Sequence, residues 1–286
     1  MPLRLSPTFR HQLAGASRPL VGMWVCSGSA LMAEICAGAG LDWLLIDMEH
    51  SPNGLVSVLA QLQAVAAYPI TPLVRVSSGD TVTLKQVLDL GAQNILVPMV
   101  STPHEAQEAV AAVHYPPRGR RGVGSALARS GRWNRVEHYL RDADEHVALF
   151  VQVETAEGVD NAAAIAAVDG VDGVFVGPSD LAASMGLPGH QTHPDVVAAV
   201  LRAFEAVQAA GVPVGVNAFD PAQAQAYLDA GAEFILVGAD VALVARGSET
   251  FADRWVTRPA GDDPLSDSAP GPAAHAVRGG RAKEGD

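Results

Sequence analysis

The chain alternates short apolar runs with longer segments of helical spacing. The runs are continuous, without regular polar alternation, which is typical of parallel strands covered on both faces. They predict eight buried strands, at residues 20–25, 43–47, 73–76, 95–99, 147–153, 173–176, 212–216 and 234–237. Apolar residues spaced by three or four predict helices between them, among others at residues 31–38, 82–90, 103–113, 196–209 and 221–230.

One phrase, a glycine followed by an apolar run, occurs three times, at residues 40–46, 91–97 and 231–237. The glycine can end a helix in a left-handed conformation, and the run after it begins a strand. Alternating units of this kind close a barrel or form a doubly wound sheet. The turn at residues 25–29 lacks the Gly-x-Gly-x-x-Gly of a dinucleotide-binding fold, and no Walker-type phosphate loop is present. The sequence therefore favours a (β/α)8 barrel.

Two segments depart from this pattern. Residues 116–135 form a connection rich in glycine and arginine, which is long enough to be a lid or a binding loop. From residue 258 onward the chain is rich in Pro, Gly, Ala, Ser and Asp and has no periodicity, which predicts disorder. We therefore expect an amino-terminal arm at residues 1–19, a barrel at 20–256 and a disordered tail at 257–286.

Composition narrows the classes of partner. Asp and Glu number 31 against 19 Lys and Arg, and the net charge of −12 argues against nucleic-acid binding. The two cysteines, Cys26 and Cys36, make no disulfide framework. No charged segment followed by an apolar one opens the chain, and no apolar run is long enough to span a membrane. We expect a soluble cytoplasmic protein.

Polar side chains stand where the predicted strands end. The carboxyl ends of the strands meet at one mouth of a (β/α)8 barrel, where active sites lie. The side chains expected there are Asp47, Glu49, His50, Arg75, Gln152, Glu154, Ser179, Asp180 and Asn217. Such an oxygen-rich set suits a hard divalent cation, and the arginine is free to hold an anion.

The lysines limit the chemistry further. There are only two: Lys85 falls in a predicted helix and Lys283 in the tail, so neither is placed to form a Schiff base. Carbanion chemistry beside a carbonyl would then need a metal ion as the Lewis acid.

Six motifs in order along the chain carry a resemblance. They are Leu-Leu-Ile-Asp-Met-Glu-His-Ser-Pro-Asn at 44–53, Pro-Leu-Val-Arg-Val at 72–76, Gly-Ala-Gln at 91–93 with Val-Pro-Met-Val at 97–100, Arg-Arg-Gly-Val-Gly at 120–124, Gln-Val-Glu-Thr at 152–155, and Val-Gly-Pro-Ser-Asp-Leu at 176–181. The chain resembles the HpcH/HpaI family of class II pyruvate aldolases over about residues 22–255.

The resemblance implies a barrel of the phosphoenolpyruvate/pyruvate-domain type and a reaction. The reaction is the reversible cleavage of 4-hydroxy-2-oxo acids to pyruvate, or a close analogue, plus an aldehyde, by way of a metal-bound enolate. It also implies that Glu154 and Asp180 hold the divalent cation, which would be Mg2+, Mn2+ or Co2+. Arg75 would contact the ketone oxygen and stabilise the enolate.

The remaining residues receive roles by the same resemblance. His50, oriented by Asp47, would move protons through a metal-bound water, and Gln152 would support the ligand shell. The substrate would also meet Ser179, Asp180 and Asn217, with backbone N–H groups before Asp180 binding the pyruvate carboxylate. The resemblance implies a homo-oligomer, a hexamer, that exchanges a last helix at about residues 240–251 and places a neighbour's Asp89 near the site.

Each assignment has a structural alternative. Asp180 can cap a helix that begins at Leu181. Arg75 can be a buried ion pair, and His50 an ordinary loop histidine. Glu49 either pairs with Arg75 or lies behind the ligands. The six arginines between 118 and 135 form a nucleic-acid patch, an anion-attracting lid or an oligomer contact; the acidic remainder of the chain disfavours the first.

Two other functions compete with the aldolase. A lyase for malyl- or citryl-CoA thioesters shares this barrel and a Glu/Asp metal pair, and the motif from Asp47 to His50 favours the aldolase over it. A barrel without activity that serves as a binding or assembly protein is the second. The intact set of Arg75, Glu154 and Asp180 argues against it.

Overall fold

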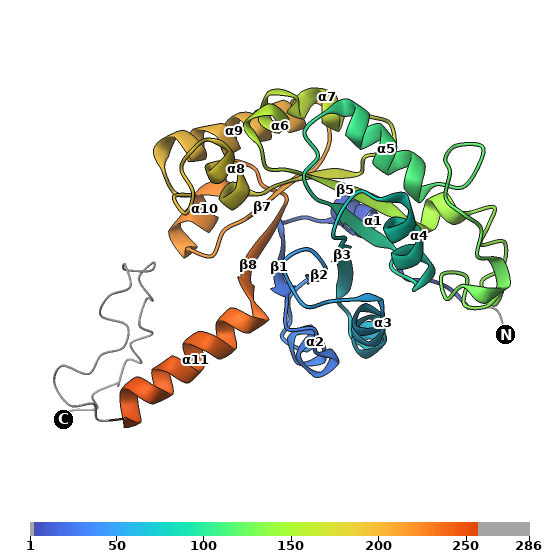
Figure 1. Cartoon of the computed structure of the whole chain (residues 1–286), viewed down its shortest axis with the longest axis horizontal. Helices are drawn as coiled ribbons and strands as arrows, with labels where there is room; N and C mark the ends of the chain where they lie inside the picture. Colours follow the sequence, from blue (N-terminus) through green and yellow to red (C-terminus); the bar gives the residue numbers. More distant parts are fainter. Residues whose placement is uncertain (1–2, 257–286) are drawn as a thin grey trace. The chain divides into compact units, whose positions relative to one another are not determined.

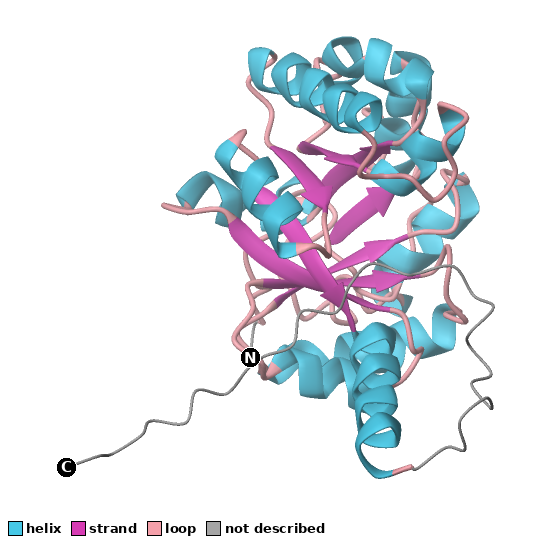
Figure 2. Ribbon diagram, turned by 90° about the vertical axis from the view of Figure 1, so that its left-hand side faces the viewer, coloured by secondary structure: helices cyan, strands magenta, loops and turns pink. Residues whose placement is uncertain are grey.

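The computed structural model describes residues 3–256 of the chain. Eight parallel strands pair in sequence order, and the last pairs with the first to close a barrel, which Figures 1 and 2 show as a ring of strands enclosed by helices. The strands are β1 (Leu20–Val25), β2 (Trp43–Asp47), β3 (Thr71–Arg75), β4 (Asn94–Val97), β5 (Ala148–Val153), β6 (Gly173–Val176), β7 (Val214–Asn217) and β8 (Phe234–Ala239). The predicted (β/α)8 barrel is confirmed.

The helices lie between the strands in the order expected. They are α1 (Phe9–Gly15), α2 (Ala30–Ala37), α3 (Leu55–Ala64), α4 (Thr81–Asp89), α5 (Pro103–Val113), α6 (Ala156–Asp160), α7 (Ala162–Ala166), α8 (Pro178–Ser184), α9 (Pro194–Ala209), α10 (Pro221–Asp229) and α11 (Asp240–Trp255), with 3-10 turns at Val65–Ala67, Ser125–Leu127 and Ala143–His146. Among the residues described, no helix combines the length and apolar character needed to cross a membrane.

Two compact units divide the chain, Met1–Ala245 and Arg246–Asp286. The first contains the whole barrel. In the second, the described residues are the remaining turns of α11, where Arg246 pairs with Glu249 at 2.8 Å. The tail that the sequence predicts to be disordered lies outside the described residues.

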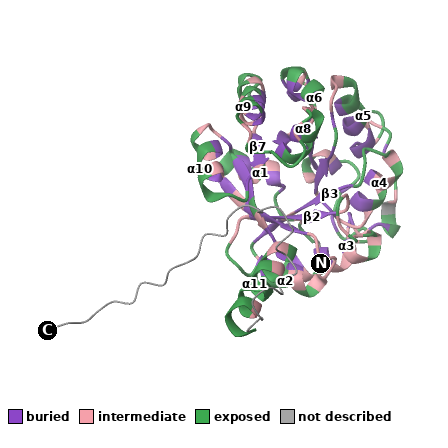
Figure 3. Ribbon diagram, turned by 60° about the vertical axis from the view of Figure 1, so that its left-hand side comes forward, coloured by how far each residue is buried: buried purple, intermediate pink, exposed green. Residues whose placement is uncertain are grey.

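The strands bury both faces, but against different neighbours. On β5, Ala148 and Phe150 point into the barrel, whereas Leu149 and Val151 pack under the surrounding helices. This two-residue alternation is the pleat of a strand. Figure 3 shows the result, with buried strands at the centre and exposed surfaces on the outer sides of the helices.

Large rings fill the barrel interior, and glycines on the next strands make room for them. Gly22 lies opposite Trp43, Gly173 opposite Phe150 and Gly215 opposite Phe234 in the strand registers. A Cβ atom at these glycines would come within 2.6, 2.5 and 2.4 Å of the rings, respectively. Any side chain there would displace a core ring, so these glycines are required by packing.

The amino end of the barrel is closed by α1. Phe9 is fully buried, with its ring 5.1 Å from that of Trp43 and 5.6 Å from that of Phe234, measured between centroids. Its backbone N–H donates to Asn94 Oδ1 at 2.7 Å, at the start of β4. The amino-terminal arm thus supplies part of the barrel core.

Candidate functional site

The strand residues that point into the barrel become polar toward the carboxyl ends of the strands. On β2 the inward residues run from Trp43 and Leu45 to Asp47, and on β3 Leu73 is followed by Arg75. Asp47 and Arg75 lie opposite each other in the β2–β3 register. The alternation that packs the core therefore aims both charged side chains at one mouth of the barrel.

Arg75 is held on several sides. Its Nε and Nη2 donate to the two oxygens of Asp47 at 2.8 and 2.9 Å, and Nη1 lies 2.9 Å from Glu49 Oε2. Burial opposes its charge, but the bonds to Asp47 and the charges of Asp47, Glu49 and Glu154 outweigh it and raise the pKa of Arg75. The guanidinium is a fixed cation, and the expected alternative of a Glu49–Arg75 ion pair is confirmed.

Trp24, on β1, supports the same guanidinium from one face. The Arg75 Cζ atom lies 4.3 Å from the centre of the indole ring, within cation–π range. The indole N–H donates to Asn217 Oδ1 at 2.7 Å, which connects β1 to the end of β7. Asn217 thus fixes the tryptophan under the arginine.

Asp47 also organises the turn that carries His50. Its carboxylate accepts the backbone N–H groups of Glu49 at 3.0 Å and His50 at 3.3 Å. Between Asp47 and the imidazole itself, the described residues include no hydrogen bond. The His50 side chain is 64% exposed, with Nε2 3.9 Å from Glu49 Oε2. Asp47 therefore positions the His50 backbone, and the ring remains free to turn toward the mouth.

Glu154, just after β5, is 1% exposed and carries a strongly shifted carboxyl group. Its Oε1 accepts the backbone N–H of Met99 at 2.8 Å, and Oε2 accepts an N–H of Gln152. Met99 has a φ of 58°, an unusual left-handed conformation for this residue type. Burial, and then the charges of Glu49 and Asp180, raise the pKa of Glu154 to about 7, although the Met99 N–H opposes the shift.

Asp180 lies in the first turn of α8, which begins at Pro178 after Gly177. The helix therefore starts earlier than the capping alternative requires, and no side-chain cap bond is present at its start. Gly177 is needed for close approach, because a Cβ atom there would lie 2.7 Å from Glu154 Oε2 and 2.8 Å from Gln152 Nε2. The small residue lets α8 bring the exposed Asp180 close enough to affect the Glu154 charge.

The donor set fits a divalent cation. Asp47, Glu49, Glu154 and Asp180 are four carboxylates near one guanidinium, a surplus of three negative charges when all are ionised. The buried Oε1 of Gln152 has no hydrogen-bond partner in the described residues. No group of three His, Cys, Asp or Glu side chains converges as a metal cage in this part of the chain. The residues fit an ion held by two carboxylates, with open positions for other oxygen ligands.

Three further predicted residues are placed differently. Ser179 is exposed beside Asp180 at the mouth. Asn217 also lies at the mouth, but its Oδ1 is taken by Trp24. Asp89 is the last residue of α4, so it lies at the opposite end of that helix from the loop that follows β3. It accepts a hydrogen bond from Arg121 at 3.2 Å. Within one chain Asp89 is therefore not part of the mouth.

The arginine-rich segment does not meet the mouth residues in the part of the chain described. Arg118 pairs with Asp144 at 3.1 Å, Arg120 with Glu108, and the fully buried Arg121 with Asp89. Arg129 and Arg132 lie at the amino end of the barrel, against the starts of β3 and β4. Most of these arginines therefore secure the segment to the helices.

A cleft of about 310 Å³ opens beside the site. It is lined by Glu49, by Ser77 and Ser78 after β3, and by Met99 after β4. Glu49 therefore borders both the guanidinium of Arg75 and this open space.

The sequence pattern predicted no role for Trp24, and it did not predict the contacts that Met99 and Gly177 make with Glu154, although both stand in the quoted motifs. Trp24 could have been identified, since it lies on a predicted strand at a position whose side chain points into the barrel. The hydrogen bond from the Met99 N–H and the close approach of Gly177 to Glu154 depend on the backbone, so the pattern of side chains does not predict them.

Comparisons with known proteins agree with this fold. The family described as HpcH/HpaI aldolase/citrate lyase matches residues 20–247. A 4-hydroxy-2-oxo-heptane-1,7-dioate aldolase of Salmonella heidelberg is 51% identical over 240 residues, which cover 84% of this chain and 91% of that one. The crystal structure of an HpcH/HpaI aldolase/citrate lyase family protein from Burkholderia cenocepacia is 42% identical, with a TM-score of 0.83 over 87% of this chain and 99% of that chain.

Proposed function

Because this chain belongs to the HpcH/HpaI aldolase/citrate lyase family and is a carbon–carbon lyase, we propose that it reversibly cleaves 4-hydroxy-2-oxo acids to pyruvate and an aldehyde. The observation that carries the proposal is the buried Arg75 beside the Glu154–Asp180 pair. Cleavage leaves negative charge on the pyruvate ketone oxygen, and a fixed cation at that oxygen stabilises it.

Arg75 has donors left for this purpose. A guanidinium carries five N–H groups. Two donate to Asp47 and a third faces Glu49, so two remain for a substrate oxygen. Since Asp47 and Trp24 already fix the group, little reorganisation accompanies the development of charge.

Glu154 and Asp180 would hold a divalent cation such as Mg2+, Mn2+ or Co2+. When bound, the ion would supply Lewis-acid polarisation of the substrate carbonyl. The surplus of negative charge at the mouth supports this assignment, and Gln152 keeps the Glu154 carboxylate in position through its N–H group.

His50 would move the proton between the substrate hydroxyl and the solvent. Its exposed ring stands on the turn that Asp47 fixes, free to turn toward the mouth, and a neutral imidazole can accept a proton. Ser179 and the backbone at the start of α8 would bind the pyruvate carboxylate, because helix starts present free N–H groups. Asn217 would act through Trp24.

The test is pyruvate release from a panel of 4-hydroxy-2-oxo acids, beginning with 4-hydroxy-2-oxo-heptane-1,7-dioate, with and without EDTA. Turnover that EDTA abolishes and Mg2+ or Mn2+ restores is expected. Cleavage of malyl- or citryl-CoA in the same assay, without cleavage of the oxo acids, would replace the proposal with a thioester lyase. No turnover of either class would favour a binding protein.

We also propose that the enzyme is a homo-oligomer, a hexamer as the resemblance implies. The support is α11, where Leu243, Phe251 and Trp255 are 63%, 65% and 76% exposed. Large apolar side chains repeated along one helix are typical of a contact surface. In that assembly a neighbour's Asp89 would approach the mouth. Light scattering at micromolar concentration tests this, and a fully active monomer would contradict it.

A further inference from the structure

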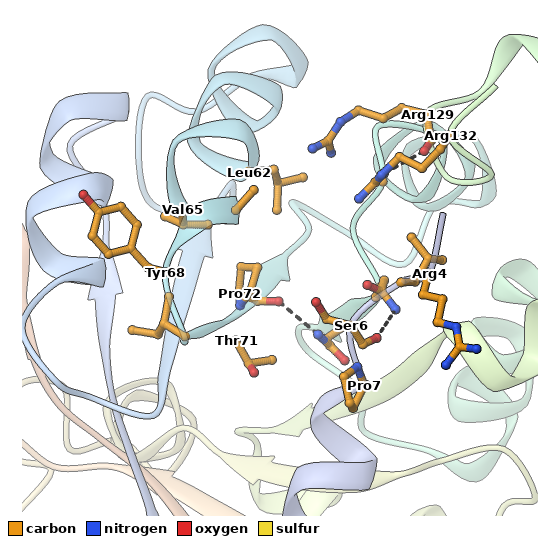
Figure 4. Close-up of a pocket in the computed structure, with 16 residues that line it drawn as sticks. Arg4, Ser6, Pro7, Leu62, Val65, Tyr68, Thr71, Pro72, Arg129 and Arg132 are labelled. Carbon is orange, nitrogen blue, oxygen red and sulfur yellow. Dashed lines mark hydrogen bonds between the residues drawn. The ribbon is translucent and has the colours of Figure 1, made fainter. Parts of the chain in front are cut away.

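A second concave site lies at the amino end of the barrel, away from the mouth. It is a cavity of about 240 Å³ between the amino-terminal arm, the starts of β3 and β4, and the arginine-rich segment. Figure 4 shows Arg129 and Arg132 extending from that segment toward Leu62 and Pro72. We name this site the basal cavity.

The two arginines converge on one point. A Cβ atom built on Gly91 would lie 2.7 Å from Nη1 of Arg129 and 2.8 Å from Nη1 of Arg132. The two nitrogens are therefore at most 5.5 Å apart, the sum of these distances. Two guanidinium groups this close repel each other unless an anion lies between or beside them.

No carboxylate neutralises this pair. Among the described residues, neither arginine has an Asp or Glu oxygen within the 4.0 Å of an ion pair. Each Nη1 donates to a backbone carbonyl, Arg129 to Leu90 at 2.8 Å and Arg132 to Arg129 at 2.7 Å. Burial and the charge of Arg132 lower the pKa of Arg129, and burial also lowers that of Arg132. The pair thus lacks the partner that Arg75 has.

Hydrogen bonds fix one wall of the cavity, and its lining includes both charged and apolar side chains. The part of the arm that lines the cavity is held by two hydrogen bonds, from Leu3 N–H to Arg135 O at 2.8 Å and from Gln93 Nε2 to Ser6 O at 3.0 Å. The wall opposite the arginines is apolar and includes Leu62, Val65 and Pro72. Arg4 also lines the cavity, although Figure 4 shows its guanidinium turned away from the other two. The lining residues include three arginines and no acid.

We propose that the basal cavity binds a small organic molecule with a doubly charged oxyanion head group, either a phosphate monoester or a short dicarboxylate. Arg129 and Arg132 would bind the head group, since planar guanidinium groups pair with phosphate and carboxylate oxygens. The apolar wall would receive a short carbon skeleton. The volume is below the roughly 300–1,000 Å³ typical of drug-sized ligands, which limits the ligand to a small metabolite.

The test is calorimetric titration of the full-length protein with inorganic phosphate and, separately, with succinate. Saturable binding of at least one probe is expected. The double variant Arg129→Gln/Arg132→Gln should weaken the affinity for the probe at least about tenfold. Arg4→Gln should weaken it by about twofold, because this side chain acts only through its electrostatic field. Phosphate binding alone identifies a phosphate ester as the ligand, and succinate binding alone a dicarboxylate.

The matched control is Arg141→Gln, which removes the same charge from an exposed arginine paired with Asp142 at 2.7 Å. It should leave binding unchanged. Equal weakening by the control would mean general attraction of anions, and binding that survives in the double variant would place the anion elsewhere; either result overturns the proposal. So does absence of binding by both probes to the wild type.

Three further measurements separate loss of binding from other effects of the substitutions. Circular dichroism and the single variants Arg129→Gln and Arg132→Gln distinguish lost binding from lost folding, and a folded single variant that binds normally also overturns the proposal. Light scattering of the double variant tests a different occupant. A decrease in assembly mass would make the arginine pair a contact between copies of the chain and would overturn the small-molecule assignment.

Discussion

The two ends of this barrel carry charges of opposite sign, and the charged side chains have different partners at each end. At the carboxyl end, Asp47 and Glu49 pair with Arg75, the Trp24 ring lies against its guanidinium, and Glu154 and Asp180 add two more carboxylates nearby. At the amino end, three arginines line a cavity that has no acidic residue. The surplus at the first end suits a cation, and that at the second an anion. The same fold thus keeps the two groups of charge at opposite ends of the strands.

The largest expected effect tests the cation at the carboxyl end. Glu154→Gln and Asp180→Asn each remove one negative oxygen from the proposed pair and should reduce turnover to background while weakening Mn2+ binding. The control is Glu157→Ala, an exposed residue of α6. Activity of either variant that persists after EDTA treatment would show that the carboxylates serve no metal.

His50→Ala should lower kcat by about 10²–10⁴, the usual range for a positioned general base. Mn2+ affinity should remain unchanged, because the ring makes no contact with Glu154 or Asp180 in the described structure. His104→Ala, on the exposed side of α5, is the control. The readouts are pyruvate α-proton exchange and metal affinity; normal exchange with lost metal binding would make His50 a ligand.

Arg75→Lys should lower kcat by about 10²–10³, because lysine keeps the charge but loses the planar donors that Asp47 and Trp24 fix. The matched substitution at the other end, Arg129→Lys, should leave kcat within twofold of the wild type. Steady-state kinetics of the pair compares the two ends directly. Similar values for both variants would mean that Arg75 is a structural ion pair.

Metal affinity should depend on pH because of Glu154. Its pKa, near 7 in the metal-free protein against an ordinary 4.5, means that a cation must displace a proton below pH 7. Apparent Mn2+ affinity should be highest above pH 7 and fall by roughly tenfold per unit below it. By the same linkage, the carboxyl group favours the metal-free fold below its unfolded pKa, and this contribution is lost as the pH rises toward 7. A flat affinity profile between pH 6 and 8 would contradict the assignment.

The smallest effect concerns the amino end. Removing both charges, in Arg129→Gln/Arg132→Gln, should change kcat and KM for the oxo acid by less than about twofold in phosphate-free buffer, since the cavity lies at the far end of β3 and β4. A large loss of kcat, with an unchanged assembly mass, would mean that the two ends are coupled through the strands.

The sequence predicts the barrel well because its signals are local. Five predicted helices lie within two residues of their observed bounds, and each glycine phrase joins a helix to a strand. Helix α3 is among the helices for which no bounds were predicted. The mouth residues were identified because strand ends in a barrel converge, whatever the details of packing.

Other features depend on contacts between distant segments. The sequence places Asp47 beside His50, only three positions away, and so favours a bond between the two side chains. In the structure the carboxylate faces Arg75, its neighbour on the next strand, and reaches His50 only through the backbone. Arg129 and Arg132 look like part of a uniform basic loop until the arm, β3 and Gly91 enclose them. Local spacing cannot encode such pairings.

The position of Phe9 has a consequence for biosynthesis. This ring precedes the barrel strands in the chain, and its partners on β5 and β8, Phe150 and Phe234, are made much later. Contacts so distant in sequence form slowly, because a long loop must close first. The arm can meet Trp43 early, but its contacts with Phe150 and Phe234 must wait for β5 and β8. The arm therefore completes its native packing only after the last strand is made, and removal of the residues before 20 would leave the base of the barrel open.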